Sequence, residues 1–396
     1  MNQRFEVAGL GALTPLADAA PALLLAKAEP LFALEGAARG GADMDAVHDM
    51  RVASRRLRET MRLLRPLYPG REYDAWYRRV SRVTRALGPV RDSDVFIDDF
   101  SRFARDLGEG GRRTVAFVVG RRMGVREGEL AALDATLARL DLEKSSRSLR
   151  KIARSAARSP QGLRPLAEFA HAAIAERADV VIGALPNAMP EENVHEQHAL
   201  RIDFKHLRYA VEVFAPVYGD DFDALHETLT AFQDTLGDLH DLHLFLDMLR
   251  DPALAVSAKR VGVSASDIAE VVELLEANAH RAFTAFAKLA AEHPAGELLS
   301  ASLLPLSRRP PAPVAVPETP HGAVAIPAEG PALAVVLEAP APVGLGDVPP
   351  IDPTAQPWRS DAAGLTIDPP VVIGAEPWVQ ANPAPVLPAT DDDEAQ

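Results

Sequence analysis

The sequence contains no cysteine, and this absence excludes several kinds of site. Without a thiol the chain can form neither a disulfide nor a thiolate metal site, and no cysteine nucleophile is possible. A chain without disulfides fits a reducing compartment. We therefore expect a cytoplasmic protein.

Long apolar runs are also missing. No segment approaches the roughly 18 uncharged apolar residues that a membrane-spanning helix needs. Residues 1–10 lack the basic stretch and the apolar core of a secretion signal. The sequence therefore predicts a soluble protein that does not insert into membranes.

Motifs of nucleotide-binding and hydrolytic enzymes are missing as well. The chain has no Gly-x-Gly-x-x-Gly, no Walker A sequence and no Gly-x-Ser-x-Gly nucleophile elbow. These absences favour a binding protein over an enzyme, and we expect no cofactor.

The net charge of −14 is unevenly distributed along the chain. After Arg309 there are one basic and 12 acidic residues, whereas the preceding part has 41 basic and 44 acidic residues. The preceding part is therefore nearly neutral. Arginine clusters within it can bind anions, because the local potential rather than the net charge governs binding.

Residues 305–396 differ from the rest of the chain in composition. They hold 20 of the 33 prolines and show no helical or alternating period, which predicts a disordered tail with extended polyproline segments. Pro357-Trp358 and Pro377-Trp378 are its aromatic anchors. They indicate either a docking segment for a protein partner or an unselected spacer.

Between about Leu16 and Leu303 apolar residues recur with helical spacing, so this part is predicted to be all-α. Glycine and proline indicate where about ten helices end. These positions are Gly40-Gly41, Pro69-Gly70, Gly88-Pro89, Gly110-Gly111, Pro160, Pro186 to Pro190, Gly219 and Pro252.

An internal repeat relates two parts of this helical region. His48-Asp49-Met50-Arg51 opens a segment that runs to Arg58, and 150 residues later His198-Ala199-Leu200-Arg201 opens one that runs to Arg208. A second shared signal follows each copy, at Leu87 to Asp94 and at Leu236 to His243. We interpret the region as two helical bundles with an approximate two-fold relation.

The repeated segments place basic residues three and four positions apart, so each forms a stripe along one helix face. The first stripe is His48, Arg51, Arg55, Arg58 and Arg62, and the second is His198, Arg201, Lys205 and Arg208. Apolar residues occupy the adjacent face: Val47, Met50, Leu57, Met61 and Leu64 in the first copy, and Leu200, Phe204, Leu207, Val211 and Phe214 in the second. Because like charges at these spacings repel, the stripes need a counter-charge, either from acids elsewhere in the bundle or from a bound polyanion. Two related stripes favour the polyanion.

Other helices add basic residues with the same spacing. Arg78, Arg82 and Arg85 share one face of the next helix, and Arg147, Arg150, Lys151, Arg154 and Arg158 share one face of a linker helix. If these helices converge, they form a basic groove whose guanidinium groups bind phosphate oxygens in pairs. The stripes carry no aromatic platform for bases, so we expect recognition of phosphate alone.

These residues resemble the CHAD domain family, a conserved histidine α-helical domain. The two His-Arg segments and the two Leu-Gly segments occur in the order that this family shows, over roughly residues 15–300. The resemblance implies a duplicated helical bundle that binds inorganic polyphosphate in a basic central channel and associates with polyphosphate granules. Relatives can carry a triphosphatase domain with a Glu-x-Glu-x-Lys strand, and this chain has no such strand.

The resemblance also implies a set of ligands and a domain division. Residue by residue, the phosphate ligands correspond to His48, Arg51, Arg55, Arg58, Arg91, His198, Arg201, Lys205 and Arg208, with Asp92, Tyr209 and Asp241 in support. His240 stands where the first copy has Arg91, which weakens the charge there. We expect an N-terminal extension (1–14), a helical domain (15–304) made of repeat 1 (15–140), a linker helix (141–160) and repeat 2 (161–304), and a tail (305–396).

Three other functions remain open. The adjacent pairs His48-Asp49 and His240-Asp241 could hold a divalent metal in a phosphohydrolase, although neighbouring arginines oppose a cation site. Non-specific nucleic-acid binding would use the same stripes, although nothing in them recognises bases. In the third, the helical region is a scaffold on the granule surface and the tail recruits partners to it.

Overall fold

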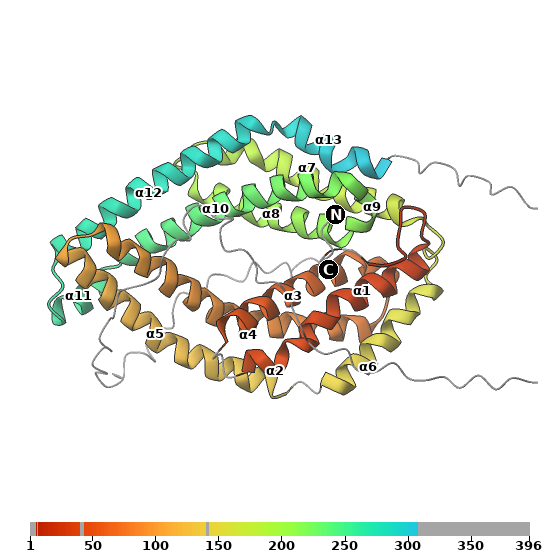
Figure 1. Cartoon of the computed structure of the whole chain (residues 1–396), viewed down its shortest axis with the longest axis horizontal. Coiled ribbons are helices and arrows are strands. Elements are labelled where there is room, and N and C mark those ends of the chain that lie inside the picture. The colour runs from red at the N-terminus through yellow and green to blue at the C-terminus, as the bar shows by residue number, and fades with distance from the viewer. Residues whose placement is uncertain (1–4, 6, 40–42, 140–141, 308–396) are drawn as a thin grey trace, which may run out of the picture. The chain divides into compact units, whose positions relative to one another are not determined.

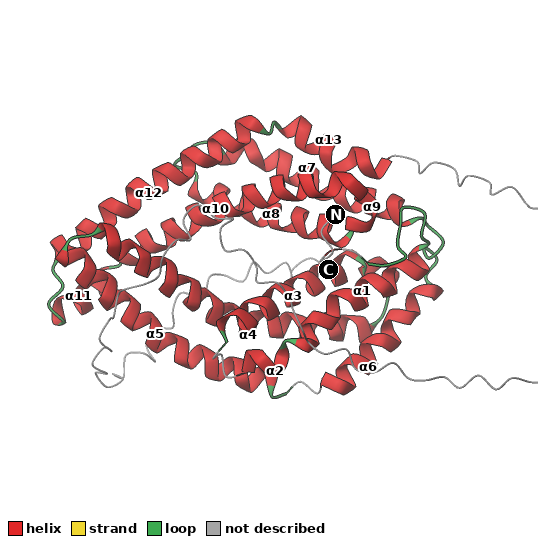
Figure 2. Cartoon of the chain, viewed as in Figure 1, coloured by secondary structure: helices red, strands yellow, loops and turns green. Residues whose placement is uncertain are grey.

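We analysed a computed structural model that describes residue 5 and residues 7–39, 43–139 and 142–307. Within these residues the chain is all-α, as predicted, and contains no strand (Figures 1 and 2). The Pro-Trp anchors predicted for the tail lie outside the described residues. In the described part, no helix combines the length and apolar character needed to cross a membrane.

The described part holds 13 α-helices and four short 3₁₀ helices, more than the sequence indicated. The α-helices are α1 (Leu16–Ala33), α2 (Glu35–Ala38), α3 (Met44–Leu63), α4 (Arg71–Phe103), α5 (Glu109–Leu137), α6 (Leu142–Ala153), α7 (Leu166–Ala188), α8 (Val194–Val213), α9 (Ala215–Tyr218), α10 (Phe222–Arg250), α11 (Pro252–Arg260), α12 (Ala265–Glu292) and α13 (Ala295–Ser307). The 3₁₀ helices are η3 (Arg65–Leu67), η4 (Ala104–Asp106), η5 (Arg154–Arg158) and η6 (Gly219–Asp221).

Elements of the two predicted repeats occur at matching positions. Helices α3 and α8 both start and end 150 residues apart, and α1 and α7 start 150 residues apart. An antiparallel bridge joins Pro15 to Pro165. Beside it the amide of Leu16 donates to the carbonyl of Arg164 (3.0 Å), and the amide of Leu166 donates to that of Thr14 (2.9 Å). These two hydrogen bonds are related by the same offset of 150.

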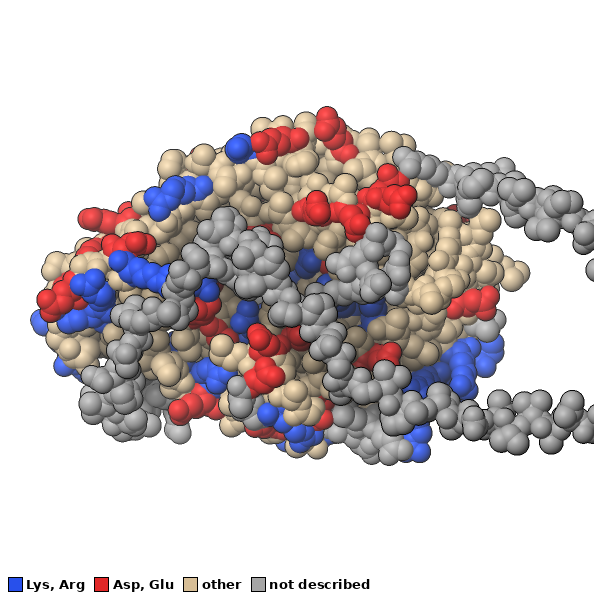
Figure 3. Space-filling view, viewed as in Figure 1, with Lys and Arg blue, Asp and Glu red and all other residues tan. Residues whose placement is uncertain are grey.

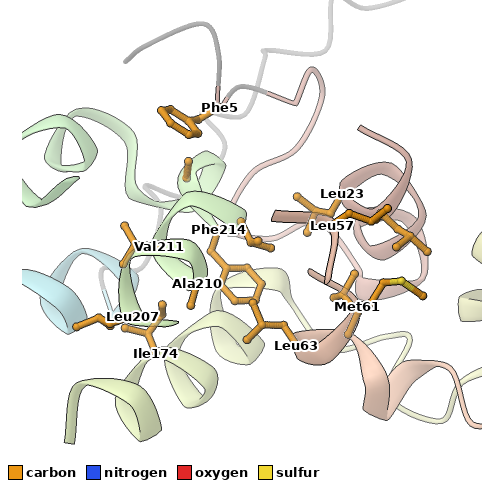
Figure 4. Close-up of a cluster of buried hydrophobic side chains, with 14 of the residues drawn as sticks. Phe5, Leu23, Leu57, Met61, Leu63, Ile174, Leu207, Ala210, Val211 and Phe214 are labelled. Atoms are coloured by element: carbon orange, nitrogen blue, oxygen red, sulfur yellow. The ribbon is translucent and has the colours of Figure 1, made fainter. Parts of the chain in front are cut away.

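The apolar faces predicted for the two repeated helices lie in one core. All five residues named for α3 and all five named for α8 are buried. Figure 4 shows Leu57 and Met61 of α3 near Phe214, at the end of α8, whose residues Leu207 and Val211 lie alongside. Burying each of these side chains stabilises the fold by about 1.5–3 kcal/mol. With their apolar faces buried, α3 and α8 turn their basic faces away from this core.

Two buried carboxylates join the repeats to each other. Glu59 of α3 accepts hydrogen bonds from Arg177 of α7 (2.9 Å) and from His206 of α8 (3.3 Å). Glu212 of α8 accepts from Arg56 of α3 (2.6 Å), from Arg208 (2.6 Å) and from His226 (3.1 Å). Each half therefore supplies a carboxylate to cations of the other half.

One predicted helix boundary needs correction. Helix α4 continues through Gly88-Pro89, where a break was predicted, because proline costs the helix a single backbone hydrogen bond that tertiary packing offsets. The predicted domain division stays a prediction. Near its two ends, Phe5 is buried against Phe222, and α13 extends to Ser307 with Leu306 buried.

The start of α5 rests on α12 through a close backbone contact. Glu270 accepts hydrogen bonds from the amides of Gly108 and Gly111, which replace bonds missing at a helix start. A Cβ at Gly111 would lie 2.8 Å from the Cβ of Leu107. Only glycine therefore fits at this position.

Replacing Gly111 with alanine should destabilise the domain by about 1–3 kcal/mol, because it overpacks this contact. Chemical denaturation followed by circular dichroism measures the change. Gly120 of the same helix has open space around its Cα, so Gly120→Ala is the control and should stabilise the helix by about 0.5–1 kcal/mol. Equal effects of the two substitutions would contradict the packing argument.

Candidate functional site

Five basic residues of α3 and α8 form what we call the cationic cluster: Arg51, Arg55, Arg58, Arg201 and Lys205. Helix α3 begins at an Asp43 cap, whose carboxylate accepts from the amide of Ala46 (2.9 Å). Helices α3 and α8 pack against each other, which brings the two predicted stripes together. The cluster thus draws on both repeats.

Lys205 is the member that shows this convergence most clearly. Burial lowers its pKa, and the nearby charges of Arg55, Arg201, Arg58 and Arg51 lower it further, to about 7. Three of these four arginines come from α3 and one from α8 itself. The dominant charges acting on Lys205 are therefore all positive.

Arg51 is held close to the backbone of α4. A Cβ at Gly88 would lie 2.8 Å from its Nη1, so the glycine makes room for the guanidinium. Its Nη2 donates to Asp92 (2.9 Å), and its side chain is only 14% exposed. Burial and the charge of Arg55 lower the pKa of Arg51 to about 10 despite the opposing effect of Asp92.

Arg201 occupies the corresponding position in the second repeat. Its Nε lies 3.9 Å from the position of a Cβ on Gly237. Burial lowers the pKa of Arg201 and Arg55 adds to the effect, whereas Asp241 opposes it. The buried Tyr209 lies near both Arg51 and Arg201 and influences the pKa of each.

The repeated Leu-Gly signal thus has a role that sequence reasoning missed. We interpreted Gly88 as a helix end, yet it lies inside α4, and Gly237 lies inside α10. Each glycine faces the arginine of the His-Arg segment in its own half: Gly88 faces Arg51, and Gly237 faces Arg201. The nearly constant distance between the two signals in each copy was the clue to this pairing.

Two carboxylates border the cluster, Asp241 of α10 and Asp92 of α4. Burial raises the pKa of Asp241 to about 6, and Asp99 and Asp238 add to this effect, whereas Arg201 opposes it. Asp92 of α4 is exposed and pairs with Arg51. The supporting acids predicted from the sequence, Asp92 and Asp241, therefore lie beside the two arginines that occupy equivalent positions in the repeats.

The predicted histidines lie at the edge of the cluster. The Nδ1 atoms of His198 and His240 are 3.1 Å apart, and burial together with the charge of Arg201 lowers the pKa of His240 to about 3. Burial and the charge of Arg91 lower the pKa of His48. Among the described residues no group of three histidine or acidic side chains could hold a metal ion.

The other predicted basic residues differ from one another in pairing and exposure. Arg208 donates to Glu212 (2.6 Å) and to Gln233 (2.7 Å), so its charge is already compensated. Arg62 is half-buried on α3, whereas Arg78, Arg82 and Arg85 are exposed on α4. Figure 3 shows Lys and Arg atoms near the middle of one face of the molecule and a second group of them over α6.

Comparison with known proteins identifies a family and a fold. The CHAD domain family model matches residues 22–250. The crystal structure of the CHAD domain from the plant Ricinus communis is similar, with a TM-score of 0.50 and 22% identity over 77% of this chain and 96% of that chain. PptA from Streptomyces chartreusis gives a TM-score of 0.53 and 15% identity over 70% of this chain and 99% of that chain. At these identities the likeness shows the fold alone. Among curated proteins, no significant sequence match is found.

Proposed function

Since this chain belongs to the CHAD domain family, we propose that it binds inorganic polyphosphate through the cationic cluster and does not catalyse a reaction. The observation that supports this most directly is the environment of Lys205, where burial and four arginines act together. Cations crowded in this way destabilise one another unless an anion enters. A chain of phosphates supplies that anion at regular intervals.

We infer that the two halves are an internal duplication and that the ligand lies between their equivalent helices. The matching positions of α3 and α8 and the equivalent surroundings of Arg51 and Arg201 support this view. A polymer of identical units suits such a site, because both halves can bind the same chemical group. His48, Arg91 and His198 would extend the contact at its ends.

Polyphosphate explains the cluster better than nucleic acid does. Sequence-independent binding of single strands uses aromatic side chains on which bases stack. Tyr209, which lies near both Arg51 and Arg201, is 5% exposed and cannot offer a face to a base. A guanidinium group can bind two phosphate oxygens at once and needs no aromatic side chain to do so. Through this binding the protein would associate with polyphosphate granules in the cytoplasm.

A titration of the full-length chain with fluorescent long-chain polyphosphate at several salt concentrations tests the proposal. We expect tight binding that weakens steeply with salt, because each neutralised phosphate releases a counterion. Single-stranded and double-stranded DNA serve as competitors at equal phosphate concentration. Displacement of polyphosphate by DNA, or no binding at low salt, would contradict the proposal.

Binding should weaken as the pH rises above about 7, the pKa of Lys205 in the free protein. A bound polyanion favours the ammonium form, so at higher pH a proton must be taken up and the affinity falls by up to about tenfold per pH unit. Protonation of Asp241 below its pKa of about 6 also makes binding tighter at low pH, because it removes a negative charge beside Arg201. Titrations between pH 6 and pH 9 measure the trend.

The control for this pH dependence is Lys205→Arg, because arginine stays charged over the whole range. The variant should bind polyphosphate with little change between pH 7 and pH 9. An equally steep pH dependence in the variant would mean that another group is responsible.

A further inference from the structure

A second group of basic side chains lies on α6 and η5, apart from the cationic cluster. Arg150, Lys151, Arg154 and Arg158 are all exposed, and we call them the α6 basic face. The opposite side of this segment is anchored by buried Leu149, Ile152, Ala153 and Ala156. The segment is therefore fixed to the domain and presents its charges outward.

Among the described residues, the α6 basic face lacks the acidic partners that several other arginines of the domain have. The exposed Arg113, for example, pairs with Glu109 one turn away on α5 and with Asp267 of α12. Within the described residues, none of the four side chains of the α6 basic face makes an ion pair or a hydrogen bond. Their charge is therefore available to an external anion.

Helix α1 separates this face from the cationic cluster. It packs against both α3 and α6, and the three helices lie side by side in the order α3, α1, α6 (Figure 1). Packed helices are about 8–10 Å apart from axis to axis, so the axes of α3 and α6 are at most about 16–20 Å apart where both helices pack against α1. Figure 3 shows Lys and Arg atoms over α6 and near the middle of the same face of the molecule.

We propose that the α6 basic face is a second binding surface for the same polyphosphate chain, so that the protein selects long chains over short ones. The inference rests on the proposed function of the cationic cluster. A long polymer bound at the cluster stays close to α6, and the second contact becomes intramolecular, which raises the overall affinity. A short oligophosphate cannot reach both surfaces. The exposed side chains of the face are all basic, which suits phosphate and offers nothing to a base or an apolar partner.

The test compares long-chain polyphosphate with tripolyphosphate on the full-length chain. The variant Arg150→Gln/Lys151→Gln/Arg154→Gln should lose about tenfold or more in affinity for the long polymer and less than about twofold for tripolyphosphate. The salt dependence for the long polymer should become shallower, by about 0.7 in logarithmic slope per lost contact. The matched control is Lys259→Gln/Arg260→Gln/Arg281→Gln, which removes three exposed charges from α11 and α12 and should leave both affinities unchanged.

Several results would overturn the inference. Equal losses for both ligands would mean that the charges act through the overall field, and no loss would mean that the face does not bind. Tighter binding of the long polymer by the variant would mean that the face holds another part of the chain, such as its acidic C-terminal residues. If the wild-type chain bound neither ligand, the proposed function itself would be wrong.

Discussion

Replacing Arg51 and Arg201 together with alanine is expected to weaken polyphosphate binding by about a hundredfold or more. A hydrogen bond from a charged group contributes about 1.5–3 kcal/mol, so the loss of two arginines removes at least about 3 kcal/mol. These two arginines are expected to matter most because they occupy corresponding positions in the two repeated segments and lie beside Gly88 and Gly237. Titration of labelled long-chain polyphosphate into the full-length variant measures the loss.

The matched control for this experiment is Arg78→Ala/Arg82→Ala, which also removes two arginines. Both residues were predicted ligands, but both are exposed on α4, so we expect a loss of less than about tenfold. Circular dichroism should show both variants folded, because removing crowded cations relieves repulsion. Comparable losses in the two double variants would show that net charge and not the position of the arginines controls binding.

The second large effect is expected for Glu212→Ala, which should lower the free energy of unfolding by about 3–5 kcal/mol. The Glu212 side chain is 1% exposed and pairs with Arg56, Arg208 and His226, so its removal leaves buried cations without a counter-charge. Thermal and chemical denaturation measure the loss. Glu227→Ala removes an exposed carboxylate from α10 and is the control, with an expected change within about 0.5 kcal/mol.

The contribution of Glu212 should also depend on pH in acid. Burial raises its pKa, but the hydrogen bond from His226 and the charges of Arg208 and Arg56 prevail and lower the pKa from 4.5 to about 2. The stabilisation is therefore complete above pH 4.5 and is lost as the pH falls towards 2. A difference in stability between wild type and Glu212→Ala that stays constant down to pH 2 would contradict this assignment.

The helical content and the apolar faces could be predicted because they depend on local spacing. Residues such as Met50 and Phe204 follow the helical period, and all ten residues named for the two apolar faces are buried. The break at Gly88-Pro89 was wrong, because α4 is held by packing against α3 and α5, which the local sequence around the proline does not show. The domain end at residue 304 stays a prediction, and α13 extends to Ser307 with Leu306 buried.

The convergence of the two stripes also followed from the sequence, because each stripe lies beside a face that had to be buried. The fate of individual charges did not follow. Arg208 belongs to the same stripe as Arg201, yet it pairs with Glu212 one turn away. The residue four positions on does differ, since it is Glu212 after Arg208 and Lys205 after Arg201, but the local sequence does not show that Gln233 and Gly237 of α10 face these arginines. Whether Arg208 also contacts a ligand remains a prediction.

The bridge between Pro15 and Pro165 has a consequence for how such a domain could arise. Its two flanking hydrogen bonds, Leu16 to Arg164 and Leu166 to Thr14, exchange equivalent backbone groups. Two identical chains that meet across a two-fold axis make contacts of this self-complementary kind. If the two halves are an internal duplication, as we propose, a half-length ancestor would have formed the same contact as a homodimer. Fusion of the two copies would then have let each half of the site change independently, as His240 at the sequence position that corresponds to Arg91 illustrates.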